Sequence, residues 1–214
     1  MITLGLHTAS AGCEVAIVRN SDCLAEVCAS MRKGQDARLP GMVVEALHSA
    51  QLQASTIDRI AVVTGPGSFT GVRVGIAFAR GLALANGIPC IGVTSLEAAL
   101  PPGQQGSAIV VLPAQKRPPE ITYWTQSFRS GASTGPATEQ GLGDLKNLLV
   151  AHPHMVFGSG EALCEALPAL TVHPAIPTAR RAAELGATFD PDDHPAVPVY
   201  ARAPDALLPG SKRP

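Results

Sequence analysis

The amino-acid sequence predicts a mixed α/β protein, on three observations. Three short apolar runs follow one another within residues 2–30 with only turns between them, which is typical of consecutive strands. Residues 35–52 and 69–86 carry apolar side chains at helical spacing. The run IAVV at residues 60–63 is typical of a strand buried in an α/β sheet. The first hundred residues therefore predict the order β-β-β-α-β-α-β-α.

The composition restricts the class of protein. Of 214 residues, 46% are hydrophobic and 15% charged, which indicates a compact fold rather than disorder. The formal net charge of −1 shows no basic excess, so we expect any contact with RNA to be shared with a partner. Five cysteines form no CxxC pair, and no apolar run approaches the roughly 20 residues that span a bilayer. We expect a cytoplasmic protein with no signal peptide and no membrane contact.

The helices of the first hundred residues have recognisable ends. Residues 35–52 are expected to form the first, with Pro40 in its first turn. Its apolar stripe consists of Leu39, Met42, Val43 and Ala46. Gly87 should stop the helix at residues 69–86, and Ser95 is the expected cap of a short third helix.

A Pro- and Gly-rich linker at residues 101–106 separates residues 1–100 from residues 107–214. The second part predicts, in order, strands at residues 108–114 and 121–128, a loop at 131–141, a helix at 144–149, a strand, glycine turn and helix at 155–163, and an alanine-rich helix capped by Thr178. The tail from residue 189 is expected to pack back on the body.

The stretch GPGSFTGVRVG, residues 65–75, is neither of the common phosphate-binding loops. Thr70 occupies the place of the third glycine of GxGxxG, and the lysine of a P-loop is missing. Backbone amides at Gly67, Ser68 and Phe69 are weak candidates for an anion site at the helix N-terminus. Ser68 or Thr70 is expected to cap the helix.

The helix after this turn contains two ridges of small residues. One consists of Gly71, Gly75, Ala79 and Ala83, and the second of Ala77, Gly81 and Ala85. Glycine inside a helix costs about 1 kcal/mol relative to alanine, so these positions indicate close packing. Two compatible interpretations are open. The helix is buried within its own fold, or one face meets another subunit with Arg73 and Arg80 at its rim.

Catalytic patterns are weak. Neither Ser68 nor Ser159 lies in a GxSxG motif. His152 and His154 can form a metal pair, but histidines beside prolines are more often solvated loop residues. The acids Asp190, Asp192 and Asp193 lie in a Pro-rich segment and are expected to be solvated. The residues give no firm indication of an enzyme.

The stretch at residues 61–100 resembles the TsaB (YeaZ) family, the dimerisation subunits of the bacterial tRNA threonylcarbamoyladenosine (t6A) machinery. The long motif GPGSFTGxRxG is present at residues 65–75. LGLHTAS at 4–10, FGSGEA at 157–162 and PVYARAPDA at 198–206 are also similar to family segments.

The resemblance implies a two-lobed α/β fold of the actin/Hsp70/sugar-kinase (ASKHA) type, with lobes at residues 1–100 and 107–214. It implies a non-catalytic scaffold that binds the catalytic homologue TsaD, joined by the ATPase TsaE, for threonylcarbamoyl transfer to the adenosine beside the tRNA anticodon. Such a chain meets tRNA only through the complex and forms a homodimer when alone. It has no cofactor of its own, although ADP or ATP can lie at the partner interface.

The family's partner-binding helices correspond to residues 35–52 and 69–86, which would form a four-helix bundle with the partner. The resemblance thereby assigns to the interface Leu39, Met42, Val43, Ala46, Thr70, Gly71, Val72, Arg73, Gly75, Ile76, Ala79 and Arg80. The segments at 34–40 and 116–124 depart from the family pattern.

His7 stands where the family has an aspartate that helps to hold a metal-nucleotide in hydrolysing relatives. Two alternative functions are a nucleotide-dependent acyl or phosphoryl transferase of the same fold and an M22-type peptidase. The transferase requires a carboxylate at the position of His7. The peptidase requires metal-binding histidines or an activated nucleophile, to which the sequence does not point.

Overall fold

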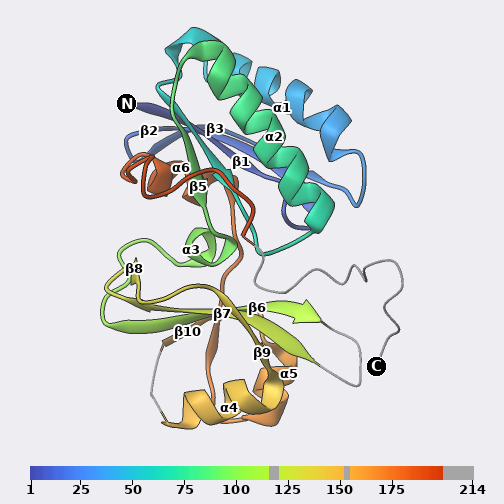
Figure 1. The fold of residues 1–214 in the computed structure, drawn as a ribbon, viewed down its shortest axis with the longest axis vertical. Coiled ribbons are helices and arrows are strands. Elements are labelled where there is room, and N and C mark those ends of the chain that lie inside the picture. The colour runs from blue at the N-terminus through green and yellow to red at the C-terminus, as the bar shows by residue number, and fades with distance from the viewer. Residues whose placement is uncertain (116–120, 152–154, 200–214) are drawn as a thin grey trace, which may run out of the picture.

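The chain folds into two α/β lobes, each built around its own sheet (Figure 1). The computed structural model describes residues 1–115, 121–151 and 155–199. The first sheet has the strand order β3-β2-β1-β4-β5, and the second has the order β11-β10-β6-β7-β8 with β9 also paired to β7. No helix in the described part of the chain is both long and apolar enough to cross a membrane.

The first sheet combines an antiparallel meander with two parallel strands. Its strands are β1 (Ile2–His7), β2 (Gly12–Arg19), β3 (Asp22–Ser30), β4 (Arg59–Val63) and β5 (Cys90–Val93). Turns join β1 to β2 and β2 to β3, whereas β4 and β5 run parallel to β1 and therefore require crossover helices. These helices are α1 (Gln35–Ser49) and α2 (Phe69–Asn86). They lie side by side on one face of the sheet (Figure 1).

The ends of α1 and α2 follow local backbone conformation. Gly87 adopts φ 64° and ends α2 at the predicted residue. The first helix ends three residues earlier than expected, at Ser49, because Gln51 turns the chain with φ 54°. A short 3₁₀ turn, η1 (Ala54–Thr56), leads from there into β4.

The cap of α3 (Ser95–Ala99) corrects the sequence prediction. Thr94, not Ser95, is the N-cap, and its hydroxyl accepts from the Glu97 amide at 3.1 Å. The Glu97 carboxylate in turn accepts from the Thr94 amide at 2.8 Å. This reciprocal pair satisfies two backbone groups at once, because Glu97 stands three residues after Thr94.

The second lobe contains more strands than its sequence predicts. They are β6 (Ser107–Gln115), β7 (Thr122–Arg129), β8 (Ala132–Ser133), β9 (Thr138–Gly141), β10 (Met155–Gly158) and β11 (Val172–Pro174). The stretch 131–141, expected to be a loop, contains β8 and β9 because both pair with β7. Its helices are α4 (Leu142–Ala151) and α5 (Glu161–Ala166).

The last helix, α6 (Ala179–Gly186), returns to the first sheet and covers the face opposite α1 and α2. A Cβ on Gly5 would overlap the carbonyl oxygen of Ala179, and a Cβ on Gly186 would overlap Ala61. Small residues on both sides therefore permit this close packing.

The chain after α6 continues along the first lobe. The Gly92 amide donates to the His194 carbonyl at 2.8 Å, and the Val199 amide donates to the Thr64 carbonyl at 2.9 Å. Residues 200–214, where the rest of the expected return lies, fall outside the described residues.

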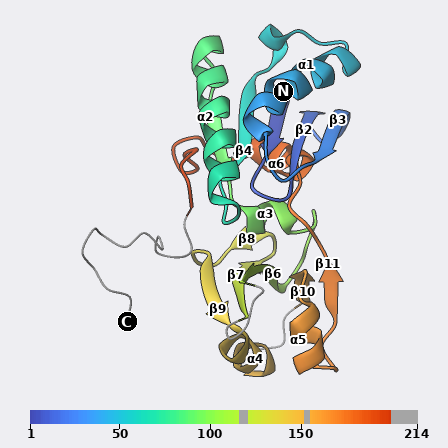
Figure 2. The same cartoon turned by 90° about the vertical axis from the view of Figure 1, so that its right-hand side faces the viewer.

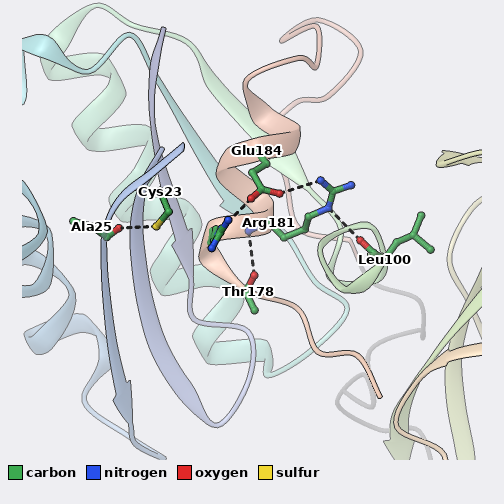
Figure 3. Close-up of polar contacts among 7 residues, drawn as sticks. Cys23, Ala25, Leu100, Thr178, Arg181 and Glu184 are labelled. Carbon is green, nitrogen blue, oxygen red and sulfur yellow. Dashed lines mark hydrogen bonds and ion pairs between the residues drawn. The ribbon is translucent and has the colours of Figure 1, made fainter. Parts of the chain in front are cut away.

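One arginine ties α6 to the start of the connection between the lobes (Figure 3). Arg181 Nε donates to the carbonyl of Leu100 at 3.1 Å, and Arg181 Nη1 pairs with Glu184 at 3.1 Å. The predicted cap Thr178 is confirmed, since its hydroxyl accepts from the Arg181 amide. Arg180 also pairs with Glu184, but it is exposed and makes no bond to Leu100.

Replacing Arg181 with Ala should lower the free energy of unfolding by about 1.5–3 kcal/mol, because a half-buried charge-assisted bond to Leu100 is lost. Chemical denaturation measures this change. Arg180→Ala is the matched control and should cost less than about 0.5–1 kcal/mol, since its ion pair is on the surface. Equal losses in the two variants would contradict the role of the Leu100 contact.

Candidate functional site

The glycine-rich turn packs directly on the end of β1. The Thr8 hydroxyl donates to the carbonyl of Gly71 at 2.7 Å, and the Ser68 amide donates to the carbonyl of Ala9 at 2.7 Å. A Cβ on Gly71 would overlap the Thr8 carbonyl oxygen, and one on Gly67 would overlap that of Ala9. These glycines therefore permit a backbone contact between the turn and β1 that other residues would prevent.

Of the two predicted caps, Ser68 rather than Thr70 is the N-cap of α2, and its hydroxyl accepts from the Gly71 amide at 3.3 Å. Of the three candidate anion donors, the Ser68 amide already donates to Ala9. The Phe69 ring lies half-exposed, 3.8 Å below the Arg73 guanidinium. Gly67 and Ser68 line a cleft between the lobes. An anion at this turn stays a prediction.

The two ridges of α2 point in opposite directions. Gly75 contacts Thr8 and Val62 beneath it, and Ala79 and Ala83 are buried in the first core. Ala77, Gly81 and Ala85 are exposed, and no atom of the described part of the chain lies within 4 Å of the position of a Cβ on Gly81. The first ridge therefore packs α2 on its own sheet, and the second is open to solvent.

This burial bears on the interface that the family resemblance implied, which stays a prediction. Nine of its twelve side-chain positions are buried within the first lobe, namely Leu39, Met42, Val43, Ala46, Gly71, Val72, Gly75, Ile76 and Ala79. These nine residues hold α1 and α2 on the sheet and on each other, so little of their surface is left for a second molecule. Thr70, Arg73 and Arg80 are exposed.

The exposed side of the helix pair carries apolar residues that the sequence analysis did not select. Leu84 of α2 is 84% exposed and Val44 of α1 is 67% exposed. Figure 2 shows α2 running along the outer edge of the first lobe. We define the outer face as the exposed residues Val44, Phe69, Arg73, Ala77, Arg80, Gly81, Leu84 and Ala85. The helical period alone marks such a face but does not say which of two faces turns outward.

A second feature is the cleft between the lobes, with a volume of about 600 Å³. His7 and Ser95 reach it from the first lobe, Trp124 and Ser159 reach it from the second, and Arg32 comes from the loop after β3. His7 is fully buried, and this desolvation lowers its pKa to about 4, so the imidazole is neutral near pH 7. These residues come from five separate segments, so no local pattern in the sequence indicates that they lie together.

The residues considered for catalysis do not assemble into a recognisable centre. The Ser159 amide donates to the Val111 carbonyl, so the backbone of Ser159 is held against β6 of the second sheet. Within the described residues no group of three His, Cys, Asp or Glu side chains could hold a metal ion. His152 and His154 lie outside the described residues.

Comparisons with known proteins agree with this geometry. The family model described as "TsaD: tRNA N6-adenosine threonylcarbamoyltransferase" matches residues 23–115. An uncharacterised protein of Mycobacterium tuberculosis is 35% identical over 209 residues, which cover 95% of this chain and 92% of that protein. The tRNA threonylcarbamoyladenosine biosynthesis protein TsaB of Escherichia coli is 34% identical over 143 residues, which cover 65% of this chain and 61% of that protein.

A solved structure completes the comparison. YeaZ from Pseudomonas aeruginosa superposes with a TM-score of 0.71 at 25% identity and covers 93% of this chain and 99% of its own. The chain belongs to the TsaB (YeaZ) family. Its two-lobed α/β architecture is the ASKHA-type fold that the motif of this family predicts. The TsaB-family motif GPGSFTGVRVG thus has a structural role here, as the contact between α2 and β1.

Two glycines of α2 should respond oppositely to alanine. Gly71→Ala forces a Cβ against the Thr8 backbone and should destabilise the protein by about 1–3 kcal/mol. Gly81→Ala fills open space and should stabilise it by up to about 1 kcal/mol, through helix propensity alone. Thermal or urea unfolding checks both. Destabilisation by Gly81→Ala would show that the second ridge is also packed.

His7 should make folding sensitive to mild acid. Its folded pKa of about 4 lies below the unfolded value of 6.5, so between these values only the unfolded state binds the proton. The free energy of unfolding therefore falls by about 3 kcal/mol from this group as the pH drops from 6.5 to 4. His7→Leu should lose less stability over that window in urea titrations. Parallel curves for the two proteins would contradict the buried neutral state.

Proposed function

We propose that this chain is the non-catalytic scaffold subunit of tRNA threonylcarbamoyladenosine biosynthesis, and that it binds a TsaD homologue through the outer face. Membership of the TsaB family supports the pathway, since relatives in Escherichia coli and Bacillus subtilis are named as biosynthesis proteins of this modification. The match to a TsaD family model supports a partner of related fold.

The outer face is the observation that carries the proposal. An open ridge of small residues, centred on Gly81, lets a helix of the partner approach closely, as in helix pairs with small side chains at the contact. Leu84, three residues after Gly81 on α2, and Val44, exposed on α1, supply apolar area that a partner would bury. Arg73 and Arg80 lie at the rim, where charged groups influence orientation and association rate.

The remaining parts of the proposal follow from this arrangement. Two helices of the TsaD homologue would complete a four-helix bundle with α1 and α2, and the ATPase TsaE would join the pair. The same face would form a homodimer when TsaD is absent. ADP or ATP would bind at the partner interface, and tRNA would be held only by the assembled complex in the cytoplasm.

The scaffold role accords with the residues at the positions where chemistry would occur. His7 replaces the metal-holding aspartate of hydrolysing relatives and is buried and uncharged, so it cannot balance the charge of a metal ion. We therefore assign threonylcarbamoyl transfer to the partner.

The test is complex formation with TsaD from the same organism, measured by size-exclusion chromatography with light scattering. The wild type should give a one-to-one complex. Gly81→Arg places a long charged side chain in the middle of the ridge and should weaken binding more than tenfold, or about 1.4 kcal/mol. Its own fold should persist, because a Cβ at Gly81 would meet no atom of the described residues within 4 Å and arginine favours helix.

Val150→Arg is the matched control, because Val150 is 70% exposed on α4 of the second lobe, outside the outer face. It should bind TsaD as the wild type does. If the wild-type chain does not bind TsaD, the scaffold function is wrong. If Gly81→Arg binds TsaD as tightly as the wild type does, the interface lies outside the outer face. Gly75→Leu is unsuitable for this purpose, since Gly75 is packed against Thr8 and Val62.

A further inference from the structure

The cleft between the lobes has the size of a small-molecule site. Its volume of about 600 Å³ lies within the range of about 300–1,000 Å³ that is usual for ligand pockets. Both lobes contribute walls, with Gly67 and Ser95 on one side and Leu112, Trp124 and Ser159 on the other. None of the lining residues of the cleft belongs to the outer face, although Ser68 of the cleft precedes Phe69 of that face in the chain.

Two buried polar side chains line this cleft without a partner. His7 is 0% exposed and Ser95 is 2% exposed. Neither ring nitrogen of His7 nor the Ser95 hydroxyl makes a hydrogen bond to any of the described residues. A buried polar group without a hydrogen-bond partner is unfavourable, so a ligand that pairs with these groups would recover free energy.

The chemistry of these groups restricts the ligand. Burial keeps His7 neutral, so one ring nitrogen donates a hydrogen bond and the other accepts one. The Ser95 hydroxyl can also do both. A hydroxyl or amide, which itself donates and accepts, matches this pair better than a fully charged group does.

The rest of the lining adds an apolar wall and one charge. Trp124 is half-buried and lies with Pro113 and Ile176 along the cleft. Arg32 is exposed and is the only permanently charged residue among the described lining residues. Among the residues that the structure describes, the lining includes no Asp or Glu, and these supply the carboxylates that usually hold Mg²⁺ with a polyphosphate.

We propose that this cleft binds a small aromatic monoanion. Its hydroxyl or amide contacts His7 and Ser95, its ring lies against Trp124, and its anionic group faces Arg32. The site is thus a receptor for a metal-free aromatic acid, and it goes beyond the scaffold function proposed above.

Three probes separate these contacts. 4-Hydroxybenzoate carries ring, hydroxyl and carboxylate, benzoate lacks the hydroxyl, and phenol lacks the carboxylate. The chain has one tryptophan, so its indole N–H gives a single reporter peak in a ¹H–¹⁵N spectrum. 4-Hydroxybenzoate should shift this peak saturably, with a Kd on the order of 1 mM. Each of the other probes should bind about fivefold more weakly, for the loss of one polar contact.

Variants assign each contact to a residue. Arg32→Gln should remove the preference for 4-hydroxybenzoate over phenol, and Ser95→Ala should remove the preference over benzoate. Arg19→Gln is the matched control, because Arg19 is exposed at the end of β2 and does not line the cleft. It should keep both preferences.

Two results would overturn the proposal. An indole peak that does not shift saturably with 4-hydroxybenzoate would mean that the cleft holds water alone. Equal affinity for the three probes, or preferences that survive Arg32→Gln, would mean non-specific binding to an apolar wall. The comparison of probes on the wild type stands even if Ser95→Ala fails to fold.

Discussion

The end of β1 lies so close to the turn before α2 that Gly67 and Gly71 have no space for a side chain. The Thr8 hydroxyl donates to the Gly71 carbonyl, while the Ser68 amide donates to the carbonyl of Ala9. This contact sets where α2 begins and how closely it lies on the sheet. The direction of each ridge and the position of the cleft wall at Gly67 follow from it.

The two sides of α2 show how one residue type serves opposite purposes. Gly75 is required by the Thr8 side chain beneath it, whereas Gly81 has no packing reason among the residues that the structure describes. Glycine and alanine on an exposed helix face provide a flat surface but little burial of their own. Exposed Leu84 beside this surface gives the face the apolar area that the small residues lack. Substitutions on the buried side of α2 should therefore alter the stability of the fold, and those on its exposed side should alter the proposed partner contact.

His7 illustrates the cost of a polar group at the base of the cleft. A carboxylate buried at this position would need a cation or several donors to remain charged. The neutral imidazole avoids the charge but leaves two ring nitrogens without a partner among the described residues. His7 lines the cleft together with Ser95 and Trp124, where we propose that its neutral ring recognises a ligand.

Local signals were sufficient for several elements. The bounds of α2 and the cap Thr178 could be predicted, and the cap of α2 was narrowed to Ser68 or Thr70, because capping and helical period depend on residues within one turn. The motif at residues 65–75 was long enough to indicate the family and with it the two-lobed fold.

Other features depended on residues far apart in the chain. The strands β8 and β9 exist because β7 offers them backbone partners, and α6 covers the first sheet because Gly5 leaves room for it. Spacing four apart defined two ridges on α2, yet only packing on Thr8 and Val62 decided which one turns inward. The sequence by itself determined the helices and the strands of the first lobe, and which residues of a helix share a face. The tertiary structure alone decided which face is buried and which distant residues line one cleft, because those choices depend on contacts between segments.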